Sequence, residues 1–325
     1  MQNIRYAFRF IKESFSIAFK TIQLQEQWVY IAVGNLILLF FWFLPLGLVL
    51  GLIGLKPVGM LLIGLIGVFM LFSFYAWSEI TREPASRRIA ALLQAGKSLV
   101  VEGTSQNAER LQAAQEIEGD GKPLLAEISQ VEEVPQEKSL FKHWSDILIL
   151  TLGLPWKRLI YHFQKLLKPE IEVKPAWIPS YTLLIPVISI ENRDLKDAVQ
   201  RIDQMIDDHL LRFQPGLVKV DLVGSLVQWI LCFIGIFIGL TVAILITDPI
   251  APDPWLLILG LGVGMLIVWL FITSGNLFSA YSRSFYHTAL YQWARNVEAA
   301  RETGEPERAV PPDILRQAIG KITKK

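Results

Sequence analysis

The sequence predicts an all-α, polytopic membrane protein: a four-helix transmembrane bundle with a helical cytoplasmic domain. Its hydrophobic content is 52% and its mean hydropathy is +0.40. Two long apolar hairpins, 28–78 and 221–280, contain only one of the 31 lysines and arginines, Lys56. Because positively charged segments stay in the cytoplasm, both termini and the middle segment 79–220 are expected on that side of the cell (cytoplasmic) membrane.

An amphipathic helix is predicted for residues 1–27. Its apolar residues recur every three or four positions: Ile4, Phe8, Ile11, Phe15, Phe19 and Ile22. Arg5, Arg9, Lys12 and Lys20 lie off this stripe. Such a helix either lies in the lipid headgroup plane or packs on the protein's own cytoplasmic domain.

Each hairpin is long enough for two spans. A span needs roughly 20 apolar residues to cross about 30 Å of hydrocarbon. The first hairpin turns at Lys56-Pro57 and the second turns within 248–254. Trp28, Trp77 and Trp255 stand at predicted span ends, where indole rings favour the membrane interface.

The four apolar cores contain no Asp, Glu, Lys, Arg or His. Ion-coupled transporters usually carry such groups within the membrane. The composition of the spans therefore favours a structural role over coupled transport, although transport through backbone carbonyls remains open.

Small and amide side chains predict how the spans associate. Glycines four residues apart allow close helix approach, and the pairs are Gly47/Gly51, Gly235/Gly239 and Gly260/Gly264. Hydrogen bonds between helices are expected from Asn35, Gln228 and Asn276. Both features indicate a tightly packed bundle rather than a pore lining.

The middle segment 79–220 includes two apolar pieces, 144–156 and 176–190, that are too short to cross a membrane. They are expected to be re-entrant, interfacial or buried in the cytoplasmic domain; a six-span topology is the alternative. An amphipathic helix follows from Leu195 to Leu210. Residues 281–325 are expected to form cytoplasmic C-terminal helices.

The candidate functional residues are Pro186, Glu191 and Arg193. Glu191 ends a proline-containing apolar segment, and with Arg193 it could line a site at the membrane surface. The favoured interpretation is that Glu191 is an acidic group near the N-terminus of the following helix, where the helix dipole stabilises negative charge. Asp203 and Asp207, four residues apart on one helix face, are interpreted as a solvated face.

Two blocks resemble a family of uncharacterised polytopic membrane proteins of bacteria and archaea. The first block is Pro186-Val-Ile-Ser-Ile-Glu-Asn-Arg-Asp-Leu-Lys-Asp-Ala198, and the second comprises Ala289-Leu-Tyr-Gln-Trp-Ala294 with Pro311-Pro-Asp-Ile-Leu-Arg-Gln-Ala-Ile319. The resemblance implies a domain of unknown function with four or more transmembrane helices and transfers no catalytic residue. The chain departs from the family pattern in a polar insert at about 97–142.

The function expected from these features is non-catalytic. The chain has one cysteine, Cys232, and no histidine spacing typical of a metal site, so no cofactor is predicted. A net charge of +1 argues against nucleic acid as a partner. Membrane lipid, and a protein partner or a homo-oligomer, are the expected partners.

The leading hypothesis is a structural, scaffolding or assembly component of the cytoplasmic membrane. The alternative is an oligomeric channel or facilitator with a site near 176–193. A weaker third possibility is a lipid-modifying enzyme that uses Glu191 or the pair Asp203 and Asp207.

Overall fold

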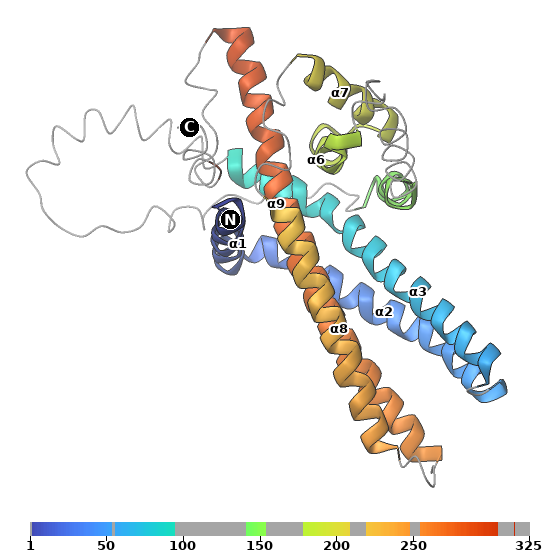
Figure 1. Cartoon of the computed structure of the whole chain (residues 1–325). Coiled ribbons are helices and arrows are strands. Elements are labelled where there is room, and N and C mark those ends of the chain that lie inside the picture. Colours follow the sequence, from blue (N-terminus) through green and yellow to red (C-terminus); the bar gives the residue numbers. More distant parts are fainter. Residues whose placement is uncertain are drawn as a thin grey trace, which may run out of the picture.

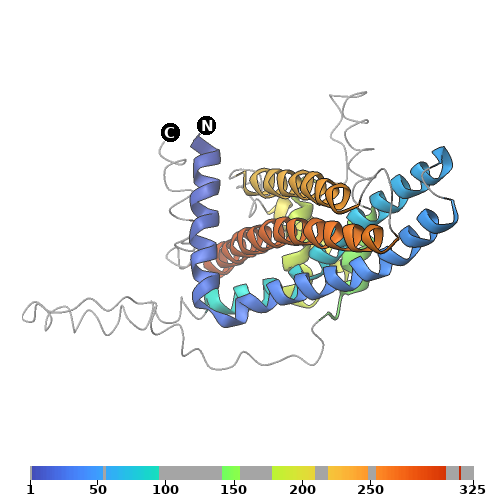
Figure 2. The ribbon, with the colours of Figure 1, turned by 90° about the horizontal axis from the view of Figure 1, so that it is seen from below.

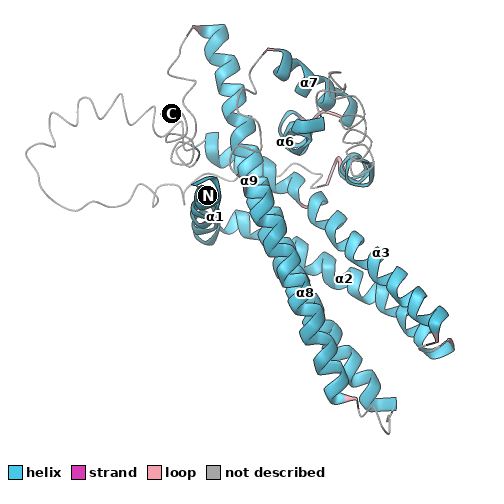
Figure 3. Cartoon of the chain, in the orientation of Figure 1, coloured by secondary structure: helices cyan, strands magenta, loops and turns pink. Residues whose placement is uncertain are grey.

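The computed structural model describes residues 2–53, 56–94, 141–153, 178–208, 219–247 and 254–304, together with Leu315. Within these ranges the chain is helical and has no strand (Figure 3). The elements are α1 (Gln2–Lys20), α2 (Ile22–Leu52), α3 (Pro57–Ile80), η4 (Ile178–Leu183), α6 (Leu184–Glu191), α7 (Leu195–Asp207), α8 (Val220–Ile246) and α9 (Pro254–Thr303). Helical residues also occupy 82–94, directly after α3, and Trp144–Gly153.

Four helices in the described part of the chain are long and apolar enough to cross a membrane. The candidate spans are Leu24–Val49, Pro57–Gln94, Val220–Ile246 and Ile258–Thr303. The prediction of an all-helical, multi-pass membrane protein is therefore confirmed at this level. The two short apolar pieces contribute only the helices Trp144–Gly153 and Tyr181–Glu191, both shorter than 18 residues.

The four spans form two antiparallel hairpins, α2–α3 and α8–α9, that meet at one end and diverge toward the other (Figure 1). A small apolar cluster lies where they meet, with one buried residue from each helix: Leu39, Phe74, Cys232 and Ile272. The lone cysteine is thus part of the packing between the hairpins. The two arms beyond this cluster are exposed apolar surface, as expected for helices surrounded by lipid.

The predicted glycine packing is present between α8 and α9. A Cβ atom at Gly239 would lie 2.6 Å from the carbonyl oxygen of Gly264, and a Cβ at Gly264 would lie 2.5 Å from that of Gly239. A Cβ at Gly235 would meet Phe271, and one at Gly260 would meet the carbonyl oxygen of Ala243. At these four positions only glycine allows the backbones to approach this closely.

The same prediction is wrong for Gly47 within this chain. Among the residues that the structure describes, no atom lies within 4 Å of a Cβ built there. Gly51 belongs to α2, but its surroundings lie outside the described residues. The close approach in the first hairpin instead occurs at Gly34, which packs directly against the indole ring of Trp77.

The predicted hydrogen bonds between helices are confirmed. The Asn35 amide donates to the Thr273 hydroxyl over 3.2 Å, which joins α2 to α9. Gln228 on α8 donates to Asn276 Oδ1 over 2.6 Å, and the Asn276 amide donates to the Phe74 carbonyl over 3.3 Å. Because hydrocarbon offers these amides no partner, their mutual bonding fixes the relative positions of the four spans.

We use the term head region for α1, 82–94, Trp144–Gly153, η4, α6, α7 and the part of α9 after Ala280. These segments share one apolar core, whose largest fully buried side chains include Tyr281, Tyr286 and Tyr291 of α9. The apolar pieces 144–156 and 176–190 are described over Trp144–Gly153 and 178–190, and both contribute buried residues to this core. Their position agrees with the alternative in which they are buried in a helical domain.

Helix α1 lies across the hairpins rather than along them (Figure 2). Its buried face includes Ala7 and Phe10, and the Tyr281 hydroxyl donates to the Ser14 carbonyl over 3.0 Å. Phe15 stacks on Phe278, with ring centroids 5.4 Å apart. One face of α1 thus packs on the protein itself, as one of the two expected placements requires. The helix ends at Lys20, and α2 begins at Ile22.

Several predicted segments lie wholly or mainly outside the described residues. They are most of the polar insert at 97–142, the end of the helix predicted to reach Leu210, and the helix predicted at 311–319, of which only Leu315 is described.

Candidate functional site

A closed ring of charged side chains lies where the two hairpins enter the head region. Arg82 donates to Glu79 over 2.5 Å and contacts His287 Nδ1 at 2.9 Å. His287 Nε2 lies 3.2 Å from Asp221 Oδ2, and Asp221 Oδ1 lies 3.7 Å from Arg283 Nε. Arg283 closes the ring by donating to Glu79 over 3.0 Å. We call these five residues the junction network.

The hydrogen bonds of the junction network indicate which nitrogen of His287 carries a hydrogen. A guanidinium group has only donors, so His287 Nδ1 must accept from Arg82. His287 Nε2 then carries the ring hydrogen and donates to Asp221. With a neutral imidazole, two arginines and two carboxylates cancel to zero net charge. His287 is 0% exposed and Asp221 is 36% exposed. The zero net charge lowers the cost of burying Glu79, Arg82 and Arg283.

Three helices supply the junction network, and the spacing within each puts its side chains on one face. Glu79 and Arg82 are three residues apart along α3 and its continuation, and Arg283 and His287 are four apart on α9. Asp221 lies in the first turn of α8. The ring therefore joins the first hairpin to the second by ionic contacts.

A second ionic cluster surrounds Glu191, the last residue of α6. The Tyr291 hydroxyl donates to Glu191 Oε1, and Arg193 Nε lies 2.7 Å from Oε2. Arg201 and Arg295 approach the same carboxylate at 3.5 and 3.8 Å. We call these residues, together with Glu298, the arginine cluster.

Glu298 on α9 completes the arginine cluster. Its two oxygens accept from Arg201 at 2.8 and 2.5 Å, a bidentate pair between α9 and α7. This hydrogen bonding holds the pKa of Arg201 above its ordinary value, so the guanidinium stays charged. Three arginines against two glutamates leave the cluster with an excess of one positive charge.

The structure brings two of the three predicted candidate residues together. Glu191 and Arg193 form a direct ion pair, whereas Pro186 is buried within α6 among core residues. The N-cap of α7 is Asp194, so Glu191 does not cap this helix, although it lies three residues before the cap and its carboxylate approaches Arg201 of α7. Glu191 instead ties α6 to α9 through Tyr291.

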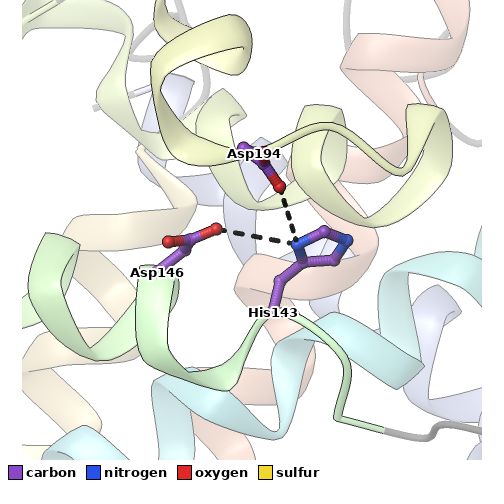
Figure 4. Close-up of side chains that lie close together, drawn as sticks. All are labelled: His143, Asp146 and Asp194. Carbon is purple, nitrogen blue, oxygen red and sulfur yellow. Dashed lines mark ion pairs between the residues drawn. The ribbon is translucent and has the colours of Figure 1, made fainter.

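A third group surrounds His143, at the start of the helix Trp144–Gly153 (Figure 4). Its Nδ1 lies 3.6 Å from Asp146 Oδ2 and 3.9 Å from Asp194 Oδ1. Its Nε2 lies 3.1 Å from Asn192 Oδ1. The three residues His143, Asp146 and Asp194 offer ligand atoms that all lie within 4.8 Å of one another, so they could hold a metal ion.

A pocket of about 850 Å³ opens beside these three side chains. Its other lining residues are mixed in character: Lys142, Ser145, Ile149, Leu150, Gly153, Leu195, Lys196 and Val199. The term histidine pocket is used for this cavity and the three residues. It lies between Trp144–Gly153 and the start of α7, both in the head region.

Comparisons of the chain with protein-family models, curated proteins and solved structures found no match. The resemblance to polytopic membrane proteins of bacteria and archaea therefore stays a prediction.

The junction network and the histidine pocket were not predicted from the sequence. A polar stripe at positions 79, 82, 83 and 86 continues the second span, and it is a sequence signal for the junction network. The histidine pocket has no comparable signal, because Asp194 is 51 residues beyond His143 and matches no ligand motif.

Proposed function

We propose that this chain is a non-catalytic scaffolding or assembly component of the cytoplasmic membrane, with the head region on the cytoplasmic side. The observation that carries the proposal is the junction network. Its charges are paired and sum to zero, and its contacts serve to hold the two hairpins and the head region in one arrangement. A rigid, charge-balanced junction suits a protein that presents surfaces to partners.

The polar side chains of the described spans support the same proposal. Asn35, Gln228 and Asn276 are engaged with other helices, as given above, and the Trp42 indole donates to the Ser73 hydroxyl over 2.8 Å. A transport pathway instead needs polar groups directed into a passage for the substrate. The channel alternative rests on Glu191, which is engaged by Tyr291 and by arginines.

Helix α1 provides the surface on which the scaffold is expected to act. Ile4, Phe8 and Phe19 lie on the same side of the helix and are 40, 52 and 67% exposed, although α1 is already packed on α9 through another face. An apolar stripe left exposed beside Lys12 is suited to lipid headgroups or to a partner protein.

The test is purification of the full chain in native lipid discs, followed by quantitative mass spectrometry and measurement of its oligomeric state. We expect a stoichiometric protein partner or a defined homo-oligomer, lost or weakened at least tenfold by Phe8→Glu with Phe19→Glu. Ser16→Glu, on the exposed polar side of α1, is the matched control and should change nothing.

The channel alternative is tested on the same preparation. Vesicles containing the purified chain should show no solute or ion flux above that of empty vesicles. Flux that disappears with Glu191→Gln would overturn the scaffold proposal in favour of the channel. A chain that is monomeric and without a stoichiometric partner in native discs would also contradict it.

A further inference from the structure

We propose that the histidine pocket binds a divalent transition-metal ion through His143 Nδ1 and one carboxylate oxygen each from Asp146 and Asp194. The proposal concerns a site separate from the junction network and the arginine cluster.

The orientation of the His143 ring leaves a nitrogen lone pair directed at the two carboxylates. Asn192 Oδ1 accepts from Lys142 Nζ over 2.9 Å, which identifies this amide atom as the oxygen. His143 Nε2, 3.1 Å from the same oxygen, is then the donor and carries the ring hydrogen. In the neutral form of the ring, which is the form that binds metals, Nδ1 is then the nitrogen without a hydrogen, and it faces Asp146 and Asp194.

Nδ1 has no hydrogen bond to either carboxylate. Its distances of 3.6 and 3.9 Å exceed the range for an N–H donor and an oxygen acceptor. The imidazole is nevertheless only 5% exposed, so a buried ring nitrogen is directed at two acidic groups without bonding to them. Metal bonds of about 2.1 Å place neighbouring ligand atoms about 3.0–3.5 Å apart, so a bound ion would draw together the three ligand atoms, which lie within 4.8 Å of one another.

The surroundings of His143 resemble the support that metal-binding histidines usually have. Such histidines donate their second ring N–H to a carbonyl or carboxylate, which fixes the ring and its tautomer. Asn192 supplies this oxygen from a left-handed backbone conformation, φ +54°, that ends α6. The backbone N–H of His143 is held in turn by the buried carboxylate of Glu83, at 3.2 Å from Oε1.

Ligand chemistry indicates the class of ion. One imidazole nitrogen with two carboxylate oxygens suits Mn²⁺, Fe²⁺ or Zn²⁺ better than Mg²⁺ or Ca²⁺, which prefer oxygen alone. Asp194 is 83% exposed, so the ion could enter from solvent and keep water on its remaining positions. Because Asp194 is the N-cap of α7, the bound ion would join α7 to the helix Trp144–Gly153.

The test uses the full chain, purified, treated with a chelator and titrated with Mn²⁺, with binding followed by electron paramagnetic resonance. Zn²⁺ is then tested by competition. We expect one Mn²⁺ ion per chain, a rise in melting temperature on binding, and displacement by Zn²⁺ but not by equimolar Mg²⁺.

Three variants make the test specific. Asp194→Asn alters an exposed side chain and should fold normally while losing at least tenfold in Mn²⁺ affinity. Asn192→Gly keeps the left-handed backbone and removes the amide, so a loss of about 10–100-fold is expected, as for other partners of metal-binding histidines. Asp197→Asn, an exposed carboxylate in the first turn of α7, is the control and should bind as the unaltered chain does.

Failure of the unaltered chain to bind Mn²⁺ and Zn²⁺ would overturn the proposal and would leave His143 as an ionic contact only. Binding that Asp194→Asn and His143→Gln leave unchanged would also overturn it, because the ion would then be held elsewhere.

Discussion

Helices α8 and α9 touch backbone to backbone through glycines, whereas α2 and α3 are joined by the indole groups of two tryptophans. In the second hairpin Gly239 and Gly264 leave no room for a Cβ. In the first hairpin the Trp77 indole donates to the Tyr30 carbonyl over 2.8 Å, and the Trp42 indole donates to Ser73. The second hairpin is therefore held by close packing of its two backbones, and the first is held by hydrogen bonds from two indole groups.

The difference shows that the same small-residue spacing has different uses in the two hairpins. Gly47, Gly64 and Gly67 of the first hairpin have no atom within 4 Å of a Cβ, so no described part of the chain packs on these positions. The spacing of glycines in a sequence indicates that close approach is allowed, and it does not identify the neighbour. Four predictions test this comparison.

The largest effect is expected where the hairpins are joined to each other. Arg283→Met removes a cation from between Glu79 and Asp221 and leaves the buried carboxylate of Glu79 with Arg82 as its one remaining cationic partner in the network, at about 3–5 kcal/mol of unfolding free energy. Titration with a denaturing detergent, followed by tryptophan fluorescence, measures the loss. Arg9→Met, which removes an exposed pair with Glu13, should change the value by less than about 0.5 kcal/mol. Equal losses in the two variants would mean that the junction network does not hold the hairpins together.

A smaller loss is expected inside the second hairpin. In Gly239→Val the new side chain meets the Gly264 carbonyl oxygen and Val268, both 2.6 Å from the position of Cβ, so α8 and α9 must separate. Overpacking of this kind costs about 1–3 kcal/mol. Gly67→Val in the first hairpin is the matched control, with an expected change within about 0.5 kcal/mol. Similar melting temperatures for the two variants would contradict the comparison.

The directional bonds of the first hairpin should each contribute less. Trp77→Phe keeps an aromatic ring against Gly34 but removes the bond to Tyr30, for a loss of about 1 kcal/mol. Trp229→Phe is the control, since Trp229 is exposed on α8. If Trp77→Phe melts at the same temperature as this control, the first hairpin is held by packing alone.

The smallest change in unfolding free energy is expected at Gly47, where no described residue packs against the glycine. Gly47→Ala replaces a flexible residue in a helix interior with nothing nearby, so we expect a gain of about 0.5 kcal/mol in detergent. The informative measurement is the oligomeric state in native lipid discs. A weaker oligomer with Gly47→Ala would show that a second copy or another helix uses this face.

The spans were predictable because the apolar runs that define them are local in sequence. The bonds of Asn35, Gln228 and Asn276 were predictable for a related reason: an amide inside hydrocarbon must find a partner. The partners themselves were not, because they depend on which helices become neighbours.

The ionic sites could not be predicted in the same way. Glu79 and Arg283 look like ordinary charges beside a span, and their burial follows only from the meeting of α3, α8 and α9. The sequence indicates Glu191 as unusual, but it does not predict the contact with Tyr291 on α9, because the two residues are 100 positions apart. His143 and Asp194 are brought together by two helices that are distant in sequence.

Helix α9 runs without a break for 50 residues, from the far end of the second hairpin to the head region. At 1.5 Å per residue it is a rod about 75 Å long, and the described part of the chain shows no joint within it. Glycine contacts fix one end of this rod to α8, and Glu298 fixes the other end to α7. Because both ends of this rod are fixed, we expect a tilt of the second hairpin in a thinner or thicker bilayer to rotate the head region as well.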